Sequence, residues 1–130
     1  MRDVIKILKS QHGKFVICGS LALYLYGLID DYNQEEIDII VDKEIKLDGY
    51  KRHINNRFNS RGWLGKINDV YIDVYNKELP DSNRVVVDGL VVYLKTLSAL
   101  KTHYLSLDIE NMNGHEKFKN KMLTRVALFK

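Results

Sequence analysis

Three acidic residues are the first candidates for chemistry in this chain. Glu36 and Asp38 stand two residues apart in the alternating stretch EIDIIVD, residues 36–42. Side chains alternate between the two faces of a strand, so both carboxylates are expected on one face. Asp73 lies in a second alternating stretch, DVYIDVY, residues 69–75. If the two strands pair, all three carboxylates meet on the same side of a sheet.

Three crowded carboxylates repel one another unless a cation neutralises them. Mg²⁺ prefers hard oxygen ligands of this kind. The pattern therefore predicts a divalent metal held by Glu36, Asp38 and Asp73. The alternative is that these acids are the ordinary solvated face of a half-exposed strand.

A Gly-Ser pair precedes the first acidic strand. Gly19 and Ser20 follow the apolar run FVIC and open the apolar segment LALYLYGL, residues 21–28. The first backbone amide groups of a helix, together with the positive end of its dipole, can bind a phosphate. Glycine has no side chain, so it lets the backbone approach the phosphate closely. A phosphate seat beside a metal site suggests nucleotide chemistry, whereas ordinary helix capping by Ser20 is the simpler alternative.

Hydrophobic periodicity and turn residues outline the elements that carry these side chains. The expected strands are 14–18, 36–42 and 69–75, with a hairpin at 85–93; the expected helices are 2–10, 21–28, 94–107 and 115–129, with a surface helix near 50–58. The predicted fold class is α+β: a small mixed β-sheet with flanking helices, followed by the β-hairpin and two C-terminal helices. Residues 1–130 are expected to form a single domain.

Composition favours a folded, soluble protein. The chain has 130 residues, of which 45% are hydrophobic and 28% charged, and its net charge is +3. This excludes disordered and collagen-like classes, and a weakly basic balance permits an anionic partner. Cys18 is the single cysteine, which excludes an internal disulfide and suggests a buried thiol. With no signal-type segment or membrane-length apolar run, the expected location is the cytoplasm.

The order of these motifs resembles the nucleotidyltransferase superfamily, which has the DNA polymerase beta-like fold. The resemblance rests on GS opening a helix after a strand, then EIDIIVD, then VYIDVY on a neighbouring strand. The later VVVDGLVVYLKTLSALKTH, followed by a basic helix, is similar to the carboxyl-terminal part of minimal members, such as the nucleotidyltransferase toxins of abortive-infection and toxin-antitoxin systems. The resemblance as a whole spans roughly residues 14 to 128.

The resemblance implies roles for individual residues at the phosphate end. Gly19 and Ser20 would hold the triphosphate of an NTP such as ATP, and Lys101 would match a lysine that reaches the phosphates. A compact ammonium group suits that role.

The resemblance also implies the reaction. Glu36 and Asp38 would hold two Mg²⁺ ions, which Mn²⁺ could replace, and Asp73 would help orient the metal at the attacking hydroxyl. The implied function is transfer of NMP from an NTP to a hydroxyl of RNA, such as tRNA, of a protein or of a small molecule. No membrane partner is expected.

Two other functions remain open from the sequence. The chain has Glu36 where such families often have Asp, and Tyr32 and Gln34 where they often have Arg and Thr. These departures favour the alternative of an inactive nucleotidyltransferase-like module that binds or regulates. A small RNA-binding domain is a third possibility and would need an exposed basic and aromatic face. Tyr24, Tyr26, Tyr71 and Tyr75 are instead expected to pack in the core.

Overall fold

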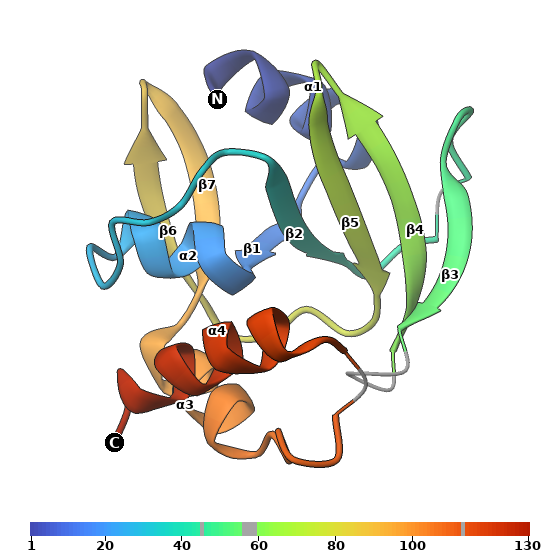
Figure 1. Cartoon of the computed structure of the whole chain (residues 1–130). Coiled ribbons are helices and arrows are strands. Elements are labelled where there is room, and N and C mark those ends of the chain that lie inside the picture. The colour runs from blue at the N-terminus through green and yellow to red at the C-terminus, as the bar shows by residue number, and fades with distance from the viewer. Residues whose placement is uncertain (45, 56–59, 113) are drawn as a thin grey trace.

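The chain folds as an α+β protein around one mixed β-sheet (Figure 1). The computed structural model describes residues 1–44, 46–55, 60–112 and 114–130. In chain order, the elements are α1 (Arg2–His12), β1 (Val16–Cys18), α2 (Gly19–Leu25), β2 (Glu36–Val41), β3 (Lys51–Asn55), β4 (Ser60–Ile67), β5 (Val70–Asn76), β6 (Ser82–Val87), β7 (Leu90–Lys95), α3 (Leu97–Leu105) and α4 (Glu116–Ala127).

The sheet has seven strands in the order β3-β4-β5-β2-β1-β7-β6. β2 is parallel to β5 and β1 is parallel to β7, while the other neighbouring pairs are antiparallel. The prediction of a mixed sheet is confirmed, but the prediction that it is small is wrong. The hairpin β6–β7 joins the same sheet through β1, and β3 and β4 extend it on the other side.

The predicted surface helix near residues 50–58 is wrong. Residues 51–55 form β3, which pairs with β4 and so reaches β5 across the sheet; residues 56–59 lie outside the described part of the chain. The polar composition of this segment favoured a surface helix. Antiparallel pairing with β4, the next strand along the chain, overrides the local propensity of this edge segment.

The helix predicted at 94–107 begins later than expected. Leu94 and Lys95 are the last residues of β7, and Thr96 is the cap residue of α3. The Thr96 hydroxyl accepts a hydrogen bond from the amide of Ala99 at 3.1 Å, which satisfies one of the first free amides of the helix. Lys95 therefore has the orientation of a strand residue rather than that of a helix residue.

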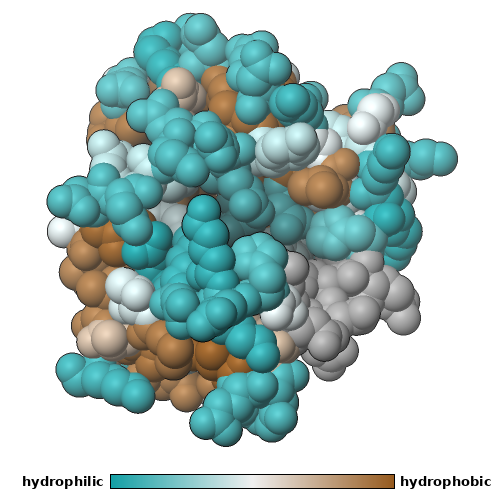
Figure 2. Space-filling model, viewed as in Figure 1, coloured by the Kyte–Doolittle hydropathy of each residue, from teal (hydrophilic) through white to brown (hydrophobic). Residues whose placement is uncertain are grey.

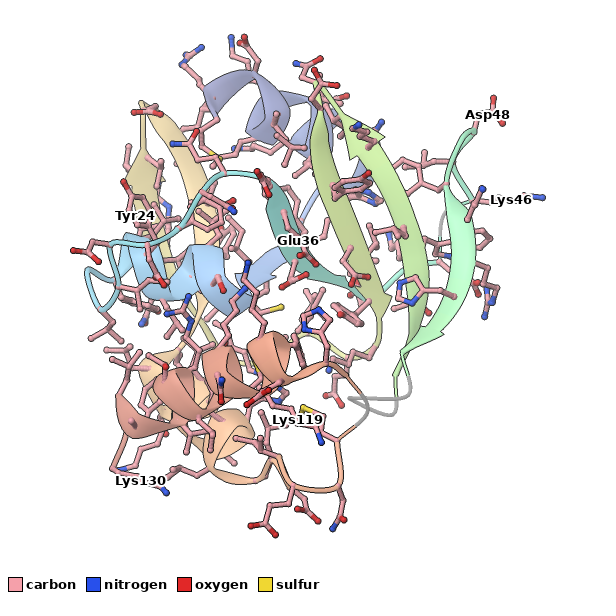
Figure 3. All side chains as sticks on the ribbon, in the orientation of Figure 1. Tyr24, Glu36, Lys46, Asp48, Lys119 and Lys130 are labelled. Atoms are coloured by element: carbon pink, nitrogen blue, oxygen red, sulfur yellow. The ribbon has the colours of Figure 1, made fainter. Side chains whose placement is uncertain are left out.

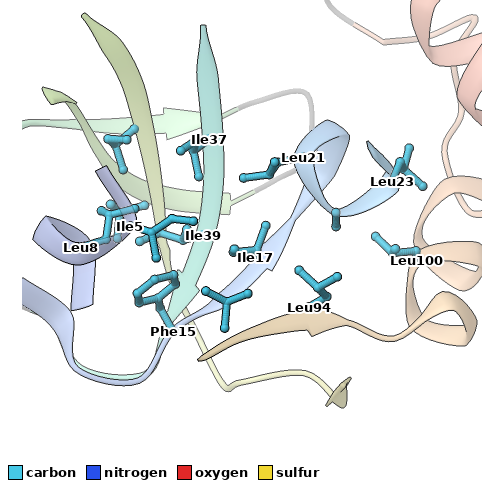
Figure 4. Packing of buried hydrophobic residues seen from close by; sticks show 14 of the residues in the cluster. Ile5, Leu8, Phe15, Ile17, Leu21, Leu23, Ile37, Ile39, Leu94 and Leu100 are labelled. Atoms are coloured by element: carbon cyan, nitrogen blue, oxygen red, sulfur yellow. The ribbon is translucent and has the colours of Figure 1, made fainter. Parts of the chain in front are cut away.

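One face of the central strands is buried in the main hydrophobic core. Ile37 and Ile39 of β2 are fully buried, and Ile5 and Leu8 of α1 lie beside them (Figure 4). Glu36 and Asp38 alternate with Ile37 and Ile39 along β2 and therefore face the opposite side of the sheet, as the alternation predicted. Burial of the isoleucines fixes the register, since a slip of one residue would bury the acids.

The tyrosines that were expected in the core divide into two groups. Tyr75 is buried and Tyr26 is half-buried against the core, but Tyr24 and Tyr71 are 40% and 50% exposed. The prediction of core packing is therefore wrong for Tyr24 and Tyr71, because their strand and helix faces are not covered.

Among the described helices, none combines the length and apolar character needed to cross a membrane.

Candidate metal centre

Parallel pairing of β2 with β5 brings the three predicted acids together. Asp38 is directly opposite Asp73 in the register of the two strands, and Glu36 lies one side-chain step along the same face. Oxygen atoms of Glu36, Asp38 and Asp73 all lie within 4.8 Å of one another. Glu36 projects from β2 into the space in front of the sheet (Figure 3). Three carboxylates at this spacing are suited to share a divalent cation.

The backbone at Gly19 approaches the middle acid closely. Gly19 is the first residue of α2 and has φ +64°, a left-handed conformation that favours glycine. A Cβ atom at this position would lie 2.3 Å from the Oδ2 atom of Asp38. Glycine is therefore required here for two reasons, and the Gly-Ser turn is part of the wall of the acidic site.

Burial and neighbouring charges perturb the Asp38 carboxylate. Its pKa is raised well above the usual 3.8, first by burial and then by the charges of Glu36 and Asp73, while Lys121 acts in the opposite direction. The Oδ1 atom of Asp38 is buried and has no hydrogen-bond partner among the described residues. An unpaired buried carboxylate oxygen is costly, and a bound cation would supply the missing partner.

Asp73 is held in place by two side-chain hydrogen bonds. Its Oδ1 atom lies 2.7 Å from the Nε2 atom of His53 on β3, and the Tyr75 hydroxyl donates to its Oδ2 atom at 2.8 Å. Each carboxylate oxygen carries two lone-pair directions, so these bonds leave a direction on each oxygen for a metal. Partners of this kind orient metal-binding carboxylates in proteins.

The acids form one wall of a pocket of about 230 Å³ between the sheet and the last two helices. Its cationic side chains are Lys77, Lys95 and Lys121. α3 and α4 contribute the rest of the opposite wall, with His103 and Tyr104 on α3 among the lining residues. The pocket therefore places acidic and basic groups in one concave site.

Burial lowers the pKa values of two side chains that line this pocket, Lys95 and His103. The pKa of Lys95 is lowered mainly by burial, and that of His103 is lowered to about 4 by burial and by the charges of Lys95 and Lys77. His103 is therefore neutral at physiological pH. An anion bound near Lys95 and Lys77 would be stabilised by their positive charges.

Two of the three predicted phosphate-binding residues line the pocket, and the third does not. Gly19 and Ser20 line the pocket, and Cys18, not Ser20, is the cap residue of α2. Lys101 is exposed on α3 and is not among the residues that line the pocket. Its role in binding phosphate stays a prediction, and Lys95 is better placed for it.

Burial raises the pKa of the Cys18 thiol to about 12, so this thiol is protonated and a poor nucleophile, as expected.

Sequence reasoning missed several residues of the site. Lys77 follows Asp73 and Tyr75 at a spacing of two, which is a signal that could have placed it on the same face. Lys95 was assigned to a helix, which hid its strand orientation. His53 has no local signal, because only the pairing of β3 with β4 and of β4 with β5 brings it to Asp73.

The close approach of Gly19 to Asp38 predicts a specific loss of stability. Gly89 is the matched control: it has φ +80°, and an added Cβ would meet nothing within 4 Å. Gly89→Ala should lower the free energy of unfolding by about 1 to 2 kcal/mol through backbone strain alone. Gly19→Ala should cost about 1 to 3 kcal/mol more, because its methyl group collides with the carboxylate.

Urea denaturation measures both of these substitutions. In an Asp38→Ala background the extra cost of Gly19→Ala should shrink, because the colliding oxygen is gone. Equal costs for Gly19→Ala and Gly89→Ala would contradict the close contact.

The raised pKa of Asp38 predicts a pH dependence of stability in the absence of divalent cations. As the pH rises above 3.8, the unfolded chain loses a proton that folded Asp38 keeps, so the free energy of unfolding falls until the raised pKa is passed. Asp38→Asn should remove this fall and be more stable than the wild type near neutral pH. Asp42→Asn, at an exposed acid just after the same strand, should retain it.

Urea denaturation over a series of pH values, with a chelator present, measures this dependence. If the free energy of unfolding depends on pH in the same way for the wild type and for Asp38→Asn, the pKa of Asp38 is not raised by folding.

Comparison with known proteins adds no family assignment to this geometry. None of the protein-family models, curated proteins or solved structures compared with the chain matches it. The function is therefore argued from the side chains that the fold brings together.

Proposed function

We propose that this protein is a Mg²⁺-dependent nucleotidyltransferase, which moves a nucleoside monophosphate from an NTP to a hydroxyl group. The observation that carries the proposal is the position of three carboxylates, within 4.8 Å of one another, on the wall of a pocket that also holds lysines. Acids alone would suit many cations. Acids and lysines in one pocket suit a metal-bound polyphosphate, whose metal binds the acids and whose phosphates bind the lysines.

The three acids have the donor set that Mg²⁺ or Mn²⁺ requires. Glu36, Asp38 and Asp73 would hold the metal, and the unpartnered Oδ1 atom of Asp38 is the clearest sign of a missing ligand. When bound at such a site, the metal neutralises phosphate charge and makes an attacking hydroxyl more acidic. Glu36 is longer than Asp by one methylene, and it is the most exposed of the three acids.

The basic residues of the pocket would bind the phosphates. Lys77, Lys95 and Lys121 line the same space as the acids. Their ammonium groups can donate to phosphate oxygens and offset the charge of the leaving pyrophosphate. Gly19 and Ser20 line the pocket beside Asp38, so backbone and hydroxyl donors of this turn lie within the same site.

The reaction would be an in-line displacement at the α-phosphorus. The acceptor oxygen forms a bond to phosphorus, the bond to the bridging oxygen of pyrophosphate breaks, and the acceptor proton leaves to water or to a carboxylate of the site. His53 and Tyr75 act as positioning residues in this scheme, because they fix the orientation of the Asp73 carboxylate.

Transfer of label from α-labelled NTPs tests the proposal. The wild type, incubated with each NTP, with Mg²⁺ or Mn²⁺, and with RNA, protein and small-molecule acceptors, should transfer labelled NMP and release pyrophosphate. Asp38→Asn and Asp73→Asn should each reduce the rate by about 100-fold or more, because each replaces a charged metal ligand by a neutral amide and so weakens the charge stabilisation of the transition state.

Asp69→Asn is the matched control for Asp73→Asn. Asp69 precedes the same strand, and its side chain is 99% exposed, so its loss should leave the rate unchanged. Equal rates for the wild type and the Asp38→Asn and Asp73→Asn variants would contradict the proposal. Metal-dependent NTP binding without turnover would favour the alternative, an inactive binding module.

A further inference from the structure

We infer that the open face of β3, β4 and β5, beside the carboxylates, binds a single-stranded nucleic acid whose terminal hydroxyl is the acceptor. This inference rests on the proposed function, and it selects one acceptor class among RNA or DNA, protein and small molecules.

In-line displacement fixes the side from which the acceptor arrives. The pocket that would hold the phosphates is closed on one side by α3 and α4, where Lys121 lies on α4 and Lys95 directly precedes the cap residue of α3. Because the attacking and leaving oxygens lie on opposite sides of the phosphorus, the acceptor must come from the side away from Lys95 and Lys121. Beyond Asp73 on that side the sheet continues into β4 and β3, in front of which Figure 1 shows no described helix.

Two large side chains are exposed on this open face next to the acids. Tyr71 is opposite Glu36 in the β2–β5 register and is 50% exposed. Leu64 is opposite Asp73 in the β4–β5 register and is 40% exposed. Residues directly opposite in neighbouring strands share a face, so both extend the surface of the site. Figure 2 shows a hydrophobic patch among hydrophilic side chains over this region.

The charge of this face favours a polyanion. Lys66 is opposite Tyr71, with its Nζ atom 5.0 Å from the ring centroid, and Lys51 is opposite Leu64. Both lysines are exposed. Among the described side chains of β3, β4 and β5 on this face, the only carboxylate is the buried Asp73. Lys66 also lies 3.7 Å from Asp69, but a pair this exposed is weak and leaves the lysine available.

An exposed aromatic ring with flanking lysines fits a single strand better than the other classes. A base can stack on the ring of Tyr71 while lysines contact the phosphates on either side, and this mode needs no sequence-specific hydrogen bonds. A duplex keeps its bases stacked inside and offers no free face to the ring. The apolar part of this face consists of two side chains, which is small for a stable protein interface.

Fluorescence anisotropy tests the inference with fluorescein-labelled oligonucleotides of about 12 nucleotides, within the span that such surfaces cover. Probes are single-stranded RNA, single-stranded DNA of the same sequence, and the RNA duplex. The wild type should bind at least one single strand more tightly than the duplex. Tyr71→Ala should weaken this binding by about 5- to 100-fold, whereas Tyr71→Phe should keep it because the ring remains.

Tyr93 provides a matched control. It lies on β7, and the Nζ atom of Lys14 is 4.6 Å from its ring centroid, so it forms the same kind of lysine–tyrosine pair elsewhere on the sheet. Tyr93→Ala should bind the single strand as the wild type does. Lys66→Ala should weaken binding of the single strand. It should also make the slope of log affinity against log salt concentration less steep by about 1, as expected for the loss of one phosphate contact.

Several results would overturn the inference: no binding of either single strand, tighter binding of the duplex, or equal losses for Tyr71→Ala and Tyr93→Ala. Thermal shift of the wild type with Mg²⁺ and each of the four NTPs separates the two proposals. If an NTP with Mg²⁺ stabilises the protein but no single strand binds, the acceptor inference fails and the proposed function stands. If a single strand binds through Tyr71 but none of the NTPs with Mg²⁺ has an effect, the proposed function fails and the nucleic-acid surface stands.

Discussion

The burial of the Asp38 carboxylate is the constraint on which the rest of the site depends. Its Oδ1 atom has no partner among the described residues, and two further carboxylates lie within 4.8 Å. Such an arrangement is unfavourable for a protein without a bound cation, as the raised pKa of Asp38 shows. The buried carboxylate lowers the stability of the folded protein at this position. Such unfavourable charged groups are typical of functional sites rather than of hydrophobic cores.

The topology of the sheet explains how the acids are kept together. β2 pairs with β1 on one side and with β5 on the other, so the strand that carries Glu36 and Asp38 is central and held along both edges. Fully buried isoleucines on its other face prevent a slip in register. Gly19 then brings the start of α2 against Asp38, and α3 and α4 close the pocket. Mobile loops are therefore not needed to position the acids, which lie on rigid strands.

The sequence was sufficient for the acids but not for their surroundings. Strict alternation predicted that Glu36, Asp38 and Asp73 share a face, and the structure brings them together. Local patterns also predicted most strands and helices near their observed positions. His53 could not be predicted, because it reaches Asp73 only through two successive strand pairings of an edge segment whose composition favours a helix. The exposure of Tyr71 likewise depends on which face the helices leave open, which is a property of the tertiary structure.

The most direct test of the proposed metal site is anomalous diffraction from crystals of the protein soaked in Mn²⁺, an ion that prefers oxygen ligands as Mg²⁺ does. The account predicts an anomalous peak bonded by carboxylate oxygens of Glu36, Asp38 and Asp73, with the Oδ1 atom of Asp38 among the ligands. Full Mn²⁺ occupancy at other sites, with no peak between these three residues, would contradict it.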